Sequence, residues 1–68
     1  MTGRPALERA RALRRWLDAQ GGRASWAVAE ANFLHRRGWT AEELAAAVAE
    51  AVDGAMFESD DDGLRVGP

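Results

Sequence analysis

The chain lacks cysteine and lysine and has one histidine, His35. Without cysteine it has no disulfide, thiolate zinc site or cysteine nucleophile, and the cytoplasm is the expected compartment. Without lysine it has no Gly-x-x-x-x-Gly-Lys phosphate-binding loop. No apolar run approaches the roughly 18 residues of a membrane span, and no apolar signal segment follows the N-terminal arginines, so no membrane contact is expected. We therefore expect a soluble protein that is not an enzyme and that binds no cofactor and no metal.

The apolar residues of the chain are mostly small. Hydrophobic residues make up 47% of the 68 residues, but alanine accounts for 15 of them. A chain of this length forms one small domain, here residues 1–68, and buries only about 60% of its unfolded surface. We expect a thin core that depends on the three tryptophans.

Two segments in the first half have the apolar period of a helix. The first covers about residues 5–20 and ends at a pair of glycines. Its apolar stripe consists of Leu7, Ala10, Leu13 and Leu17, with Trp16 beside it. The second covers about residues 26–37, after Ser25 as N-cap, and ends where Gly38 can adopt a left-handed conformation. Its apolar residues surround much of the helix, which predicts a central position in the domain. They are Trp26, Ala27, Ala29, Ala31, Phe33 and Leu34.

Glu30 interrupts the apolar face of the second helix between Trp26 and Leu34. A carboxylate is costly there unless it is paired or lies at the rim of the face. Trp16 and Trp26 are most simply explained as core residues. A tryptophan exposed beside an alanine-rich helix would instead be a candidate hot spot for a protein partner.

The third helix has the clearest start in the sequence. Thr40 and Glu43 have the spacing of a capping box, which predicts a helix over residues 41–53. Trp39 and Leu44 stand at the positions of a hydrophobic staple. The buried stripe of this helix is expected to contain Leu44, Val48, Ala51 and Val52.

Residues 56–66 predict a β-hairpin around the turn Asp60-Asp61-Asp62-Gly63. Pairing Ser59 with Leu64 places Glu58 opposite Arg65 and leaves the other face apolar. Because an isolated hairpin is marginally stable, its apolar residues must pack on the helices. They are Phe57, Leu64 and Val66. The expected fold class is therefore mainly α, a three-helix bundle with a C-terminal β-hairpin.

This order of elements resembles the winged-helix variety of the helix-turn-helix fold. The resemblance rests on residues 35–44, which contain a helix end, a glycine turn and a capped helix, and on the wing-like segment 56–66. The short strand that is usual between the first two helices is represented only by Gly22-Arg23-Ala24. The resemblance implies nucleic-acid binding, with the third helix in the major groove. That helix has no Arg, Lys, Asn or Gln here, so the base-reading residues of the family cannot be transferred onto this sequence.

Charge divides the chain into a basic and an acidic half. Residues 1–38 carry eight arginines against three acidic residues, whereas residues 39–68 carry one arginine against eight. The acidic third helix and hairpin suit a basic protein surface or another helix better than a phosphate backbone. We therefore expect a small accessory regulatory module with a protein partner. Its candidate protein-binding residues are Glu42, Glu43, Ala46, Glu50, Asp60, Asp61 and Asp62.

Two alternatives stay open. A DNA-binding regulator would contact phosphates through the basic half, with affinity that falls steeply with salt. Its candidate residues are Arg11, Arg14, Arg15, Arg23, Arg36 and Arg37. A homodimer joined between opposite charges is compatible with either function.

The acidic turn also has part of a calcium-loop spacing. Glu58, Asp60, Asp62 and Gly63 occupy positions 1, 3, 5 and 6 of such a loop, but the bidentate glutamate of position 12 would fall beyond Pro68. We interpret the turn as the solvated tip of a hairpin.

Overall fold

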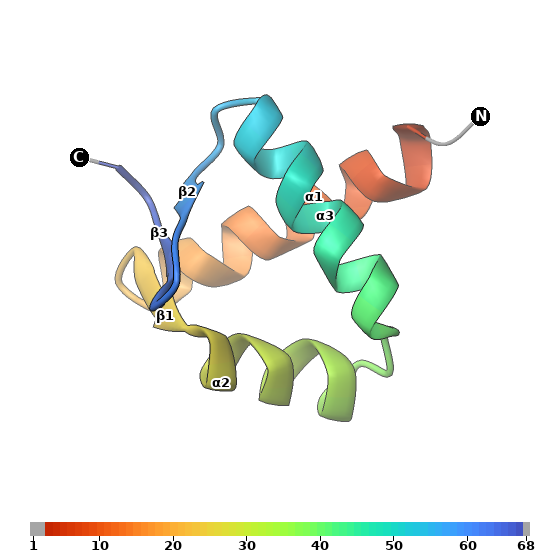
Figure 1. Ribbon diagram of the computed structural model, residues 1–68, viewed down its shortest axis with the longest axis horizontal. Helices are drawn as coiled ribbons and strands as arrows, with labels where there is room; N and C mark the ends of the chain where they lie inside the picture. The colour runs from red at the N-terminus through yellow and green to blue at the C-terminus, as the bar shows by residue number, and fades with distance from the viewer. Residues whose placement is uncertain (1–2, 68) are drawn as a thin grey trace.

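The computed structural model describes residues 3–67, which form three helical regions and a small sheet (Figure 1). The elements follow in the order α1 (Gly3–Ala19), β1 (Arg23–Ser25), α2 (Trp26–Glu30), η1 (Ala31–Arg36), α3 (Ala41–Asp53), β2 (Glu58–Ser59) and β3 (Gly63–Arg65). The predicted fold class, mainly helical with a C-terminal hairpin, is confirmed.

The helix boundaries match the prediction except in the second helix. The third helix has the expected bounds, and α1 begins at residue 3 and ends at residue 19. The second helix has five α-helical residues and then a π-helical segment, η1, in which the Arg37 N–H donates to the Asn32 carbonyl over 3.1 Å. The expectation of one continuous α-helix over residues 26–37 is therefore wrong. No proline or glycine marks the change within the helix, so the sequence contains no local signal for it.

The helices α1 and α3 end in a Schellman pattern, in which an N–H beyond the helix donates to a carbonyl five residues earlier, and η1 ends in a wider version that spans six residues. These hydrogen bonds join Gly22 to Leu17, Trp39 to Phe33 and Met56 to Ala51. The left-handed residue of the motif is Gly21 (φ 86°) after α1 and Gly38 (φ 76°) after η1. After α3 it is Ala55, with φ 58°. The Cβ of an alanine is crowded in this conformation, so α3 ends at a strained residue.

The sheet has the strand order β1-β3-β2 and is antiparallel. Ser59 pairs with Leu64 and Glu58 with Arg65, as predicted, and Arg65 Nη2 lies 3.1 Å from Glu58 Oε1. Strand β1 pairs with the free edge of β3 and so extends the hairpin to a sheet of three strands. Gly63 makes this close pairing possible, because a Cβ at this position would lie 2.1 Å from the carbonyl oxygen of Ala24.

The core is centred on Phe33, which is fully buried. Its ring meets Trp16 edge-on, with centroids 5.1 Å apart, and lies 4.5 Å from the centroid of Trp39. All three tryptophans are partly buried and surround the core instead of filling it. The other buried hydrophobic residues are Ala10, Leu13, Leu17, Ala29, Leu44, Ala47, Val48, Ala51, Phe57 and Leu64.

Two predicted faces are corrected by the structure. Val52, expected in the buried stripe of α3, is 41% exposed, and Ala47 is buried in that helix. Ala27 and Ala31 are exposed, so the second helix is not surrounded by the core. The reason is that α3 packs directly across α1, and the second helix lies along one side of that pair (Figure 1).

We predict that Ala55→Gly stabilises the protein by about 0.5–1 kcal/mol, because glycine removes the Cβ that is crowded in the left-handed conformation. In thermal unfolding the midpoint should rise by roughly 4 °C. The matched control is Ala46→Gly, at an exposed position inside α3, which should cost about 1 kcal/mol. Equal destabilisation by the two substitutions would contradict the left-handed assignment of Ala55.

Candidate functional site

An apolar groove of about 540 Å³ lies between the second helix and α3. One wall comes from α2 and η1, the other from α3, and the hairpin contributes Ser59. The lining residues are Trp26, Glu30, Leu34, Ala41, Leu44, Ala45, Val48, Ala49, Val52, Asp53 and Ser59.

Each wall contains a row of side chains spaced four residues apart, which places them on one side of a helix, and α3 adds a second such row of Leu44, Val48 and Val52. On the second helix this row is Trp26, Glu30 and Leu34, beside the buried Phe33. On α3 an alanine row runs through residues 41, 45 and 49. Since these alanines offer only methyl groups, the α3 wall is shallow and can be approached closely.

Trp26 is held in place at the groove by the hairpin. Its Nε1–H donates to the carbonyl oxygen of Asp60 over 2.7 Å. The start of α2 is fixed in turn by Ser25, whose hydroxyl accepts from the Val28 N–H, which confirms the predicted N-cap. Trp26 is partly buried against the core and also lines the groove beside the alanines of α3, so it is neither fully buried in the core nor fully exposed.

The charged residues of the groove are both acidic. Glu30 and Asp53 are exposed, one on each wall, and the described residues of the lining include no basic one. Within residues 3–67, the ion pairs of the structure involve neither of these carboxylates. Glu30 therefore lies at the rim of its apolar face, where a carboxylate keeps its hydration.

The predicted protein-binding residues are dispersed and lie outside the lining of the groove. Glu42 and Ala46 are exposed on α3, while Glu50 is half-buried. The carboxylate of Asp60 accepts hydrogen bonds from the N–H groups of Asp62 (2.9 Å) and Gly63 (3.1 Å), which shape the turn of the hairpin. The side chains of Asp61 and Asp62 are exposed on this turn.

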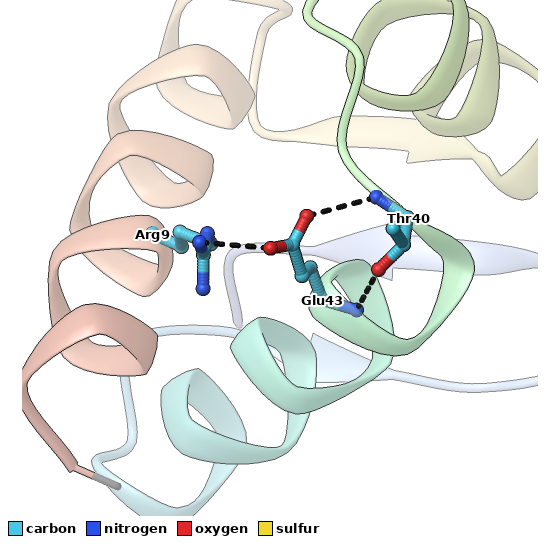
Figure 2. Close-up of polar contacts among 3 residues, drawn as sticks. All are labelled: Arg9, Thr40 and Glu43. Carbon is cyan, nitrogen blue, oxygen red and sulfur yellow. Dashed lines mark hydrogen bonds and ion pairs between the residues drawn. The ribbon is translucent and has the colours of Figure 1, made fainter.

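Glu43 has a structural task that joins two helices (Figure 2). Its Oε1 accepts from the Thr40 N–H over 2.9 Å, and its own N–H donates to the Thr40 hydroxyl over 3.0 Å, which confirms the capping box. Its Oε2 accepts from Arg9 of α1 over 3.0 Å. Both carboxylate oxygens of Glu43 are thus already bonded within the chain.

The predicted nucleic-acid-binding arginines lie on separate elements. Arg14 is used inside the fold, because it pairs with Asp18 over 3.1 Å and donates to the Met56 carbonyl oxygen. Arg23 of β1 lies directly opposite Arg65 of β3, so two like charges face each other across the sheet.

The remaining members of that set are all exposed. They are Arg11 and Arg15 on α1, Arg36 at the end of η1, and Arg37 just after it. The guanidinium of Arg37 lies 5.5 Å from the centroid of the Phe33 ring, a cation–π distance. The basic residues therefore extend over three elements of the chain.

The side chains and helices of residues 3–67 meet the requirements of neither a metal site nor a membrane span. These residues contain no group of three or more histidine, aspartate or glutamate side chains that could hold a metal ion. None of the helices they form combines the length and the apolar character needed to cross a membrane.

Comparisons with family models, curated proteins and solved structures find no match for this chain.

We predict that Glu43→Ala lowers the free energy of unfolding by about 1–2 kcal/mol, because it removes the carboxylate that accepts from the Thr40 N–H and pairs with Arg9, while the bond from its own N–H to the Thr40 hydroxyl is kept. Glu43→Gln keeps an oxygen for the Thr40 N–H and should cost less than about half as much. The control is Glu42→Ala, on the exposed side of the same turn, with a change of only a few tenths of a kcal/mol. Urea unfolding of the three variants measures this order, and equal losses for Glu42→Ala and Glu43→Ala would contradict it.

Proposed function

We propose that this chain is a small, non-enzymatic protein-binding module of winged-helix-like architecture, which holds its partner in the groove between the second helix and α3. The observation that carries the proposal is the groove itself, with an indole fixed at its edge and Val52 41% exposed. A concave apolar surface with a rigid aromatic anchor has the composition of a protein-binding hot spot.

The order of the elements supports the winged-helix part of the proposal. The short strand that the resemblance requires between the first two helices is present as β1, and it pairs with the hairpin. The glycine turn at Gly38 and the capped start of α3 provide the remaining features on which the resemblance rests.

The distribution of charge favours a protein partner over DNA. A phosphate backbone near α3 would meet Glu42, Glu50 and Asp53 and would find no basic or amide side chain on that helix. The arginines all lie on other parts of the chain, and three of them, Arg9, Arg14 and Arg65, are already paired with carboxylates. The exposed candidates Arg11, Arg15, Arg23, Arg36 and Arg37 come from α1, β1 and the end of the second helix, so none is on the helix that the winged-helix resemblance places in the major groove.

The experiment places a photo-crosslinking amino acid at Ala49, inside the groove, in cells that naturally produce the chain. We expect one discrete adduct with a protein, identified by mass spectrometry. The matched control has the same amino acid at Ala27, which is exposed on the second helix and lies outside the groove lining. This control should give none of that adduct.

Three outcomes would contradict the proposal. An adduct with nucleic acid would favour the DNA-binding alternative. Equal yields at Ala49 and Ala27 would show collision without a defined site. An adduct between two copies of the chain would assign the groove to a homodimer, in place of a separate partner.

A further inference from the structure

We infer that the occupant of the groove is a single amphipathic α-helix of another protein, with basic residues along both edges of its apolar stripe. This inference rests on the proposed function and specifies the chemistry of the partner.

The scarcity of polar groups in the groove selects a helix over an extended peptide. Among residues 3–67, the polar side chains of its lining are those of Glu30, Asp53 and Ser59. The walls are helices, whose backbone groups are bonded within themselves. An extended peptide would leave its own N–H and C=O groups without partners here, whereas a helix satisfies them internally.

The shape of the walls also suits a helix. Side chains spaced four apart form the ridges that interdigitate when helices pack, and both walls consist of such rows. Methyl groups at Ala41, Ala45 and Ala49 permit an approach near the lower end of the roughly 8–10 Å range of interaxial distances. Trp26 at the hairpin end provides the larger contact that fixes the register of the occupant.

The acidic residues Glu30 and Asp53 of the groove favour basic residues on both edges of the apolar stripe of the partner helix. Glu30 stands on one wall and Asp53 on the other, and the lining offers them no basic partner. A lysine or arginine on each edge of the incoming helix covers apolar surface with its stem and carries its charge to a carboxylate. Such rim pairs add specificity and speed association more than they add affinity.

The test uses three synthetic helical peptides of about 18 residues, a length above that at which isolated helices are marginal. The first has leucines at every third or fourth position, flanked by lysines. The second replaces the lysines with glutamates, and the third keeps the first composition but scrambles the leucine positions. Each is titrated into isotopically labelled protein, and the backbone, alanine methyl and Trp26 indole signals are followed.

We expect only the lysine-flanked peptide to bind, with shifts at Ala45, Ala49, Val52 and the Trp26 indole. Ala45→Gln and Ala49→Gln should each weaken it on the order of tenfold, because a longer polar side chain occupies the shallow wall. The matched control, Ala46→Gln, lies on the exposed surface of α3 outside the groove and should leave the affinity unchanged. All three positions are exposed, so these variants keep the fold.

The charge of the rim is tested separately. The double variant Glu30→Gln with Asp53→Asn should weaken the lysine-flanked peptide roughly five- to tenfold and remove most of its dependence on salt. Its control, Glu42→Gln with Asp61→Asn, changes the net charge equally at exposed positions outside the groove. This control should shift the affinity less than about twofold.

Each contrary result has a distinct meaning. Equal binding of the lysine and glutamate peptides would overturn the basic character of the occupant. Equal binding of the scrambled peptide would overturn its helical stripe. If no peptide binds at about 1 mM while Ala49 still crosslinks to a protein in cells, the helical occupant is wrong and the protein-binding function stands. If the crosslink is also absent, both fail.

Discussion

The packing of Phe33 is the interaction on which the arrangement of the helices depends. Its buried ring touches Trp16 of α1 and Trp39 ahead of α3, so one side chain of the second helix joins all three helical regions. Because Phe33 and Ala29 face the core, Trp26 and Leu34 of the neighbouring row lie beside the core and half-buried, and Glu30 between them is exposed. The groove wall on the second helix is a direct consequence of this packing.

The charges of the chain are organised around the same frame. Part of the charge of the basic and acidic halves is neutralised by ion pairs within the fold. These pairs are Arg9 with Glu43, Arg14 with Asp18, and Arg65 with Glu58. The first of these pairs also holds α1 against the start of α3, the helix that forms the second wall of the groove (Figure 2). Glu30 and Asp53 are the charged residues of the groove lining, and they take part in none of these three ion pairs.

Local signals in the sequence predicted most of the fold. The capping box at Thr40, the N-cap at Ser25 and the pairing of Ser59 with Leu64 all depend on near neighbours, and all are present. The π-helical segment and the exposure of Val52 depend on how helices pack on one another, which periodicity does not report. The groove escaped prediction for the same reason. The spacing of Trp26, Glu30 and Leu34 and of the alanines of α3 can be read from the sequence. No signal between near neighbours in the sequence, however, shows that these two rows lie side by side. The acidic residues were predicted to bind a protein from their charge alone. Two of them, Glu43 and Asp60, use their carboxylates for hydrogen bonds within the fold.

We propose that the groove between the second helix and α3 receives a basic amphipathic helix. The most direct measurement attaches a nitroxide spin label to the centre of the lysine-flanked peptide and records paramagnetic broadening of the alanine methyl signals. Binding in the groove should give strong broadening at Ala41, Ala45 and Ala49, and less at Ala27, which is exposed and lies outside the lining. Broadening centred away from the α3 row, or uniform over all these methyl groups, would contradict it.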